Sequence, residues 1–289
     1  MRQSVISGLY WVQQRPLLAM LLSAFCFALM NLCVKLLPGL PNHEVVFFRS
    51  LGLALLCLPG LHKLPVRKLD QSIQKDLFLR AFFGTLGLIA YFYTLKAMPL
   101  ASAVSLQYLN PIFASLVALF LLSEPVRARQ WLFFGISFSG VLLIRGFNGQ
   151  ISGFALGVGI FAAACSGFSY TYVRKLRGRA APNQVILWFA SFSLVLLGPY
   201  TLLNWVWPIG LDWLWIGLLG LSTYSAQVLM TWAYQGNKRL ALVAGLNYTG
   251  LIYALLLGWL VFGEQISLLA LLGMGLIVAG VMLGSRQAD

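Results

Sequence analysis

Long apolar stretches separated by short polar segments make up most of this chain. A helix needs roughly 20 predominantly apolar residues to cross a bilayer, and ten stretches approach or exceed that length. They cover residues 17–36, 44–61, 77–97, 101–122, 130–147, 152–174, 184–203, 211–235, 240–262 and 267–284. The pattern predicts an all-α integral membrane protein with ten transmembrane helices, a leader at 1–16 and a tail at 285–289.

Composition agrees with this pattern. Apolar residues make up 60% of the chain and charged residues only 9%, against about 25% in an average soluble domain. Such a chain cannot cover a soluble globule with polar surface, since too few polar residues are available. This excludes a cytosolic enzyme, a nucleic-acid-binding protein and a disordered regulator. We therefore expect the lipid bilayer as a partner and no nucleic acid.

The charge distribution predicts the orientation. Lys and Arg number 20 and Asp and Glu 7, giving a net charge of +13. If the amino terminus lies inside, 16 of the 20 basic residues fall on one side, in segments that include Arg67 and Arg177. Cytoplasmic loops of membrane proteins carry such an excess. We therefore expect both termini in the cytoplasm and the chain in a bacterial cytoplasmic (inner) membrane.

The chain also repeats itself. A shift of 140 residues aligns 100–144 with 240–284 without a gap and gives 13 identical pairs in 45 positions. Chance in so apolar a composition would give ~4–5. The repeat units are 17–147 and 152–284, and each holds five helices, so the second unit enters the membrane from the opposite side. Inverted repeats of this kind underlie alternating access in many secondary transporters, which predicts a transporter.

Polar side chains recur at equivalent places in the two units. At 100° per residue, Gln107 and Asn110 share a stripe of small residues, and Asn247 takes the place of Gln107 in the second unit. Such groups either line a polar cavity or join helices by hydrogen bonds, because facing lipid would leave them unsatisfied. The candidate substrate-binding residues are Asn31, Arg49, Tyr91, Gln107, Tyr108, Asn110, Ser166, Tyr170, Tyr224, Gln227, Asn247 and Tyr248.

Arg49 stands out because it lies inside the predicted span 44–61. An unpaired Arg near the bilayer centre costs roughly 2.5–3.5 kcal/mol on insertion scales. Its side chain could extend to the outer surface, pair with Glu44 or receive an anionic group of a solute. Lys35 is a weaker candidate for the last role. Glu124 and Glu264 are expected to complement the amino terminus of the helix that follows each.

Other chemistry is not indicated. His43 and His62 lie at helix ends or loops without metal-ligand spacing, and no base lies near a buried serine, so we expect no catalytic residue, metal or cofactor. The four cysteines fall in apolar runs and are expected to be free, buried thiols. The stretches 130–147 and 267–284 carry small residues but few hydrogen-bonding groups. They are expected at the periphery and are candidates for a homodimer contact.

These features resemble a known family. The motif residues are Leu95–Ala103 and Tyr108–Pro111 through Glu124, their counterparts from Lys238 and from Asn247-Tyr248 through Glu264, and Phe47-Phe48-Arg49. Together they are similar to the ten-helix EamA-type branch of the drug/metabolite transporter superfamily. The resemblance implies a central cavity between helices 1–4 and 6–9, with helices 5 and 10 outside it.

The expected function is alternating-access transport of a small polar metabolite. One intramembrane Arg and no mid-membrane carboxylate favour an amino acid, a related zwitterion or a small anion, and the resemblance implies that export is the commoner direction. A quaternary-ammonium or other organic cation, held by an aromatic cage that includes Tyr91, Tyr224 and Tyr248, is the alternative. A channel or a lipid flippase is a further alternative.

Overall fold

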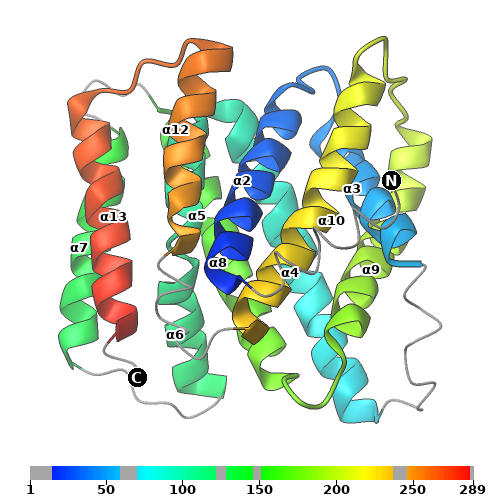
Figure 1. The fold of residues 1–289 in the computed structure, drawn as a ribbon, viewed down its shortest axis with the longest axis horizontal. Helices are drawn as coiled ribbons and strands as arrows, with labels where there is room; N and C mark the ends of the chain where they lie inside the picture. Colours follow the sequence, from blue (N-terminus) through cyan, green and yellow to red (C-terminus); the bar gives the residue numbers. More distant parts are fainter. Residues whose placement is uncertain (1–14, 59–69, 122–127, 146–150, 237–245, 287–289) are drawn as a thin grey trace.

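The computed structural model describes residues 15–58, 70–121, 128–145, 151–236 and 246–286. Within these ranges the regular structure is helical, and the helices lie side by side in one bundle (Figure 1). They are α2 (Pro16–Lys35), α3 (Asn42–Cys57), α4 (Gln71–Ala97), α5 (Leu100–Gln107), α6 (Asn110–Leu121), α7 (Ala128–Arg145), α8 (Gly153–Lys175), α9 (Pro182–Leu203), α10 (Asp212–Gly236), α12 (Thr249–Phe262) and α13 (Leu268–Arg286).

The helices suit a bilayer. In the described ranges six helical stretches are long and apolar enough to cross a membrane, counting α5 and α6 as one, and α7, α12 and α13 are apolar but shorter. Large apolar side chains cover the outside of the bundle; Leu203 is 86% exposed and Phe120 is 85% exposed. Water would penalise such a surface and lipid does not. The all-α architecture expected from the sequence is confirmed.

The two halves of the chain pack mainly against each other. Helix α4 packs along α8, and α2 packs along α10; α6 contacts α8, and α12 contacts α2; α4 contacts α9, and α3 contacts α10. Glycines bring several of these helices close together. A Cβ on Gly52 of α3 would lie 2.8 Å from the Cα of Gly220 on α10, and one on Gly87 of α4 would lie 3.0 Å from the Cβ of Cys165 on α8.

Helices α7 and α13 form a pair at one edge of the bundle (Figure 1). Gly140 and Gly273 let their backbones touch, and the Ser137 hydroxyl donates to the Ile277 carbonyl at 3.4 Å. Their peripheral position agrees with the expectation for 130–147 and 267–284. Several of their small residues, including Gly140, Gly273 and Gly280, lie at the contact between α7 and α13. A homodimer contact through their outer faces stays a prediction.

The predicted span 101–122 is wrong in one respect, because it is not one continuous helix. Helix α5 ends at Gln107, two residues form a turn, and α6 begins at Asn110. Pro111 explains the interruption, since it has no N–H to bond the carbonyl four residues earlier. The Leu109 N–H bonds Leu106 at the tighter three-residue spacing.

A second interruption lies at the equivalent place in the other half. The sequence predicts a helix over 240–262, of which residues 240–245 lie outside the described residues. Helix α12 begins only at Thr249, after a turn at Tyr248. Tyr248 corresponds to Tyr108 by the 140-residue shift. Both predicted spans are therefore interrupted at equivalent tyrosines, Tyr108 and Tyr248.

Helix α4 is longer than predicted and sets the two ends of the bundle. It begins at Gln71 rather than 77, with the Asp70 carboxylate accepting the Gln71 N–H at 3.1 Å, and its 27 residues span about 40 Å. Helix α2 ends beside the last turn of α4, where Lys35 donates to the Met98 carbonyl at 2.8 Å. Helix α8 ends beside the first turns of α4, where Lys175 pairs with Asp76 at 2.8 Å.

Candidate functional site

A cluster of polar side chains lies between the two halves, with Tyr91 of α4 at its centre. Tyr91 is 7% exposed, and the side chain of Asn31 on α2 lies near its hydroxyl. Tyr108 and Tyr170 lie within electrostatic range of the same hydroxyl. The Asn31 side-chain oxygen is buried without a hydrogen-bond partner. Four helices thus bring a predicted site residue to one place.

The interrupted helices add to this cluster. The Tyr108 hydroxyl donates to the Asn247 carbonyl at 3.0 Å, and the rings of Tyr108 and Tyr248 lie 4.8 Å apart, edge to face. Gly250 makes this possible, because a Cβ there would lie 2.6 Å from the Tyr108 hydroxyl. Asn247 contributes its backbone rather than its amide to this contact. The two turns therefore meet, and they place aromatic faces and backbone carbonyls beside the tyrosine cluster.

Gln107 joins the two halves through Ser166. Its side-chain nitrogen donates to the Ser166 hydroxyl at 2.7 Å, while its side-chain oxygen is buried without a partner. Asn110 is half-buried at the start of α6, and its carbonyl packs against Gly167 of α8. Both residues lie on the seam between α5, α6 and α8. Ser166 and Gln107 therefore join two helices by a hydrogen bond, which is one of the two roles that the sequence leaves open for such groups.

Arg49 is buried, and two expectations for it are wrong. It is the eighth residue of α3 and only 4% exposed, so its side chain does not extend to the surface. Glu44 does not pair with it either: Glu44 Oε2 accepts the Val206 N–H at 3.2 Å, and Oε1 is buried without a hydrogen-bond partner. The Nε and Nη1 atoms of Arg49 are buried without hydrogen-bond partners. The guanidinium lies over the ring of Phe189 on α9, at 5.5 Å from its centre.

Arg80 is a second buried guanidinium, and the sequence analysis did not select it. It is one of the 16 basic residues that the sequence analysis assigns to the cytoplasmic side. In the structure it is the tenth residue of α4. Its Nε and Nη1 atoms are also buried without partners, and it lies 4.1 Å from the centre of the Phe189 ring. Asp70 could have revealed this position, because an Asp is a common residue just before a helix. A helix that begins at Gln71 rather than 77 places Arg80 well inside it.

Tyr170 links the arginines to the tyrosine cluster. It lies within electrostatic range of Arg49, Arg80 and Tyr91. Its side chain is 49% exposed although these neighbours are largely buried. The hydroxyl of Tyr170 adds a donor and an acceptor near two guanidiniums whose Nε and Nη1 atoms lack hydrogen-bond partners.

Two further predicted site residues, Tyr224 and Gln227, have other neighbours. Tyr224 of α10 has Cys57, in the last turn of α3, as its electrostatic neighbour. Gln227 accepts, through its backbone carbonyl, the hydroxyl of Thr231 at 2.8 Å. The equal spacing of the two copies predicts them at the site, and that stays a prediction.

Lys35 and Glu264 form an ion pair at one end of the bundle. The second Glu264 oxygen accepts the Leu100 N–H at 2.8 Å. Glu264 thus caps the amino terminus of α5, not that of the following helix as predicted. Lys35 is already paired, so a solute group would have to compete with Glu264. Glu124 lies outside the described residues.

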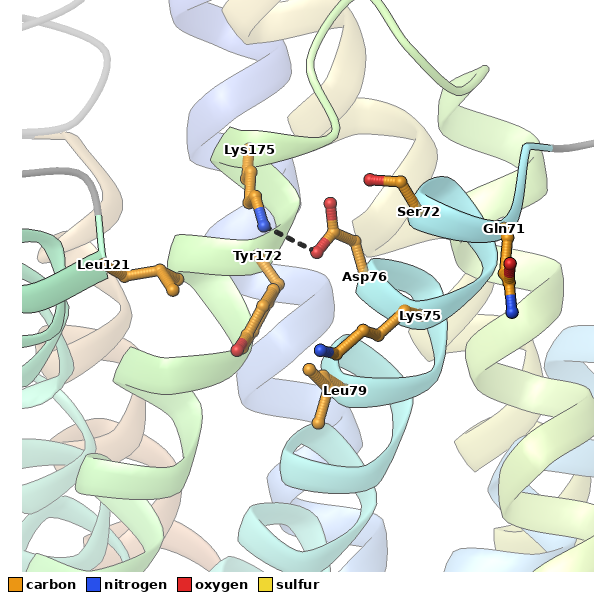
Figure 2. Close-up of a pocket in the computed structure, with 8 residues that line it drawn as sticks. All are labelled: Gln71, Ser72, Lys75, Asp76, Leu79, Leu121, Tyr172 and Lys175. Carbon is orange, nitrogen blue, oxygen red and sulfur yellow. Dashed lines mark hydrogen bonds and ion pairs between the residues drawn. The ribbon is translucent and has the colours of Figure 1, made fainter.

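At the opposite end, a cavity of about 650 Å³ opens between α4, α6 and α8. Its lining includes Asp76, Lys75, Tyr172 and Lys175, and Figure 2 shows the Lys75 and Tyr172 side chains extending toward the same space. Lys175 and Arg179 both hold the Asp76 carboxylate. The lining also includes Leu79, the chain neighbour of Arg80, but neither Arg80 nor Arg49. The cavity is therefore distinct from the arginine site.

The arrangement has the chemistry of an anion-binding site. In the described part of the chain no group of three or more His, Cys, Asp or Glu side chains could hold a metal, and all four cysteines are free. Cys33 and Cys165 are buried, while Cys26 and Cys57 are only half-buried. The unpartnered groups at the cluster are mainly donors: two guanidiniums beside several hydroxyls. Such donors bind carboxylates or phosphates.

Known proteins match this chain over nearly its whole length. The sequence profile of the EamA-like transporter family matches residues 14–146 and 153–286. The pseudopaline exporter CntI of Pseudomonas aeruginosa is 28% identical over 268 residues, covering 92% of this chain and 94% of that protein. A riboflavin transporter of Rhizobium johnstonii is 27% identical over 272 residues, covering 93% of this chain and 90% of that protein.

The fold is also known from a solved crystal structure. That chain superimposes with a TM-score of 0.62 and 21% sequence identity, and the match covers 95% of this chain and 97% of the other. The likeness shows the fold alone. The family match shows more, because it spans both halves of the chain, and the relatives named above are transporters. This chain therefore belongs to the EamA-like transporter family and is an integral membrane transporter.

Proposed function

We propose that this protein is an alternating-access secondary transporter that exports a small carboxylate-bearing metabolite across a bacterial cytoplasmic membrane. An amino acid, a related zwitterion or a small anion fits this description. The observation that carries the proposal is Arg49, a buried guanidinium with unpartnered Nε and Nη1 atoms between the two halves. A carboxylate on the solute supplies the missing partner.

The acidic residues of the described chain support this assignment, because those near the bundle ends are occupied elsewhere. Glu44 accepts from Val206 through Oε2 and has Lys96 as its electrostatic neighbour, although its Oε1 has no hydrogen-bond partner. Asp76 pairs with Lys175, and Glu264 pairs with Lys35. An unpartnered guanidinium inside a membrane protein is costly and marks a functional site by default. A solute carboxylate would offset that cost while it is bound. The relative named as an exporter is consistent with the proposed direction.

An inverted arrangement of the two halves supports alternating access. Helices α2 and α8 are equivalent by the repeat, yet α2 ends beside the last turn of α4 and α8 beside its first turns, about 40 Å apart. Equivalent helices also make equivalent contacts. The contact of α4 with α8 corresponds to that of α10 with α2, and the contact of α6 with α8 corresponds to that of α12 with α2. Two such halves can exchange roles around a shared site.

Cysteine labelling tests the topology. Gly39 and Arg177 are exposed, follow equivalent helices and belong to opposite faces in the proposed arrangement. In a variant lacking the four native cysteines, Gly39→Cys should react with an impermeant thiol reagent in intact cells. Arg177→Cys should react only after permeabilisation. Labelling of both from the same side would overturn the inverted arrangement and the cytoplasmic termini.

Transport by reconstituted protein tests the function. A thermal-shift screen of the purified protein against a metabolite library selects the solute, and proteoliposomes then measure its counterflow. We expect saturable counterflow that Arg49→Gln abolishes without loss of folded protein, and that Arg177→Gln, an exposed control, leaves unchanged. Single-channel currents would favour a channel, and scrambling of labelled lipids a flippase. Unchanged counterflow in Arg49→Gln would overturn the proposal.

The alternative solute is an organic cation. The aromatic pair Tyr108 and Tyr248 beside Tyr91 favours it, since aromatic faces bind quaternary ammonium groups. Two buried guanidiniums disfavour it, because like charges repel. Stabilisation of the purified protein by choline but by no carboxylic acid would establish this alternative.

A further inference from the structure

We propose that Arg80 acts with Arg49 as a second acid-binding group, so that the transported solute carries two acidic groups. This inference rests on the proposed function and specifies its substrate class. It concerns a residue that the sequence analysis did not select. The two guanidiniums form one site because both lie over the ring of Phe189, at 5.5 Å for Arg49 and 4.1 Å for Arg80.

Each arginine enters the site from a different end of the bundle. Arg49 lies about 10 Å from the start of α3, and Arg80 lies about 14 Å from the start of α4. In each, the Nε and Nη1 atoms are buried without partners. Phe189 on α9 lies beside both, so the site joins the first half of the chain to the second. Four unpartnered donor atoms therefore gather around one aromatic ring.

Electrostatics indicates why two acidic groups fit better than one. Arg49 and Arg80 are near enough to repel each other. The contact of each cation with the aromatic ring offsets only part of the cost of an intramembrane Arg. One solute carboxylate would leave one uncompensated charge. Two acidic groups neutralise both guanidiniums and give each a charge-assisted hydrogen bond.

The surroundings of Arg80 are shaped to hold its guanidinium in this position. A Cβ on Gly84 would lie 2.6 Å from Nη1 of Arg80 and 3.0 Å from the Phe189 ring. Gly84 is one turn later on α4, so the side chain extends along the helix, away from the bundle end. The Ser169 hydroxyl donates to the Arg80 carbonyl at 3.0 Å and fixes the backbone beneath it. Gly84 is therefore a positioning residue for Arg80.

The test compares diacids with their monoesters. The probes are short- and medium-chain dicarboxylic acids, with and without an α-amino group, each paired with its monomethyl ester. Thermal-shift titrations of the full chain in detergent give apparent affinities. We expect wild-type protein to bind at least one diacid about tenfold more tightly than its monoester, the value of one charge-assisted hydrogen bond.

The variants assign this preference to Arg80. Arg80→Gln should remove the preference for the diacid and leave monoester binding unchanged, and Arg80→Lys should retain part of the preference. Gly84→Ala keeps every charge but displaces the guanidinium, so it should reduce the same preference. Arg129→Gln, which removes an exposed cation from the peripheral helix α7, is the control and should bind as the wild type does.

The outcomes separate the two proposals. If every monoester binds wild-type protein as tightly as its diacid, and Arg49→Gln abolishes both, the inference about Arg80 is wrong and the proposed function stands. If a diacid preference exists but survives in Arg80→Gln, the inference is also wrong. If no carboxylic acid stabilises the wild type, the proposed function is wrong and this inference with it.

Discussion

Tyr108 donates its hydroxyl hydrogen to the backbone carbonyl of Asn247, at 3.0 Å, and so joins the two interrupted helices. The rings of Tyr108 and Tyr248 meet edge to face at the same point. Helix interruptions near the middle of a bundle leave backbone groups available and occur at binding sites of other transporters. The two turns are therefore coupled directly rather than through intervening helices.

The first prediction concerns this hydrogen bond. Tyr108→Phe keeps the ring contact but leaves the Asn247 carbonyl without its donor, which should destabilise the protein by about 1 kcal/mol. In the proposed alternating-access mechanism this bond lies between two parts that move relative to each other, so the counterflow rate should change by more than the loss of folded protein explains. Thermal unfolding and the counterflow rate are measured on the same preparations.

Gly250→Ala should disturb the same contact by crowding the Tyr108 ring. The added Cβ would lie 2.6 Å from the Tyr108 hydroxyl, so the ring must move. Its effect should not add to that of Tyr108→Phe in the double variant, because both act on one contact. Additive effects would show that the two residues act independently.

The second prediction concerns the pair of Lys35 and Glu264. Glu264→Gln leaves a largely buried ammonium without its counter-ion and weakens the bond to the Leu100 N–H. Breaking a buried pair in this way costs about 3–5 kcal/mol, and partial exposure here places the effect at the lower end. Lys35→Met in the Glu264→Gln background should recover part of the lost stability in thermal unfolding. No recovery would mean that the pair contributes little.

The third prediction concerns the opposite end. The Asp76 carboxylate is buried and holds Lys175 and Arg179, which are each about one-third exposed. Asp76→Asn should destabilise the protein by roughly 1–3 kcal/mol, between the values for surface and buried pairs. Since the cations are partly exposed, high salt should narrow the gap between wild type and variant in thermal unfolding. A gap that widens with salt would contradict this account.

The fourth prediction concerns the contact between α3 and α10. A Cβ on Gly52 would lie 2.8 Å from the Gly220 backbone, so Gly52→Ala must separate the helices and should cost about 1–3 kcal/mol. Gly217→Ala is the matched control on α10, because that Cβ would meet nothing within 4 Å. The control should be neutral or slightly stabilising, since Ala favours the helix. Equal unfolding temperatures would disprove the close contact.

Much of the site could be predicted from residue type and spacing. Asn31, Tyr91, Tyr108 and Tyr170 were selected because hydrogen-bonding groups in apolar stretches must face protein or water, and the structure brings them together. Tyr224 and Gln227 were selected for the same reason, and their place at the site stays a prediction. Repeat symmetry relates positions along the chain and does not fix the rotation of each helix, so it does not by itself place a side chain at the site.

The sequence by itself determined the helical membrane architecture, because uninterrupted apolar stretches leave the backbone only one way to satisfy its hydrogen bonds in lipid. Only the tertiary structure decided that Arg80 meets Arg49 at Phe189 and that Glu264 belongs to Lys35 and α5. These partners come from segments distant in the chain. Their pairing depends on how helices pack and rotate, which local periodicity does not encode.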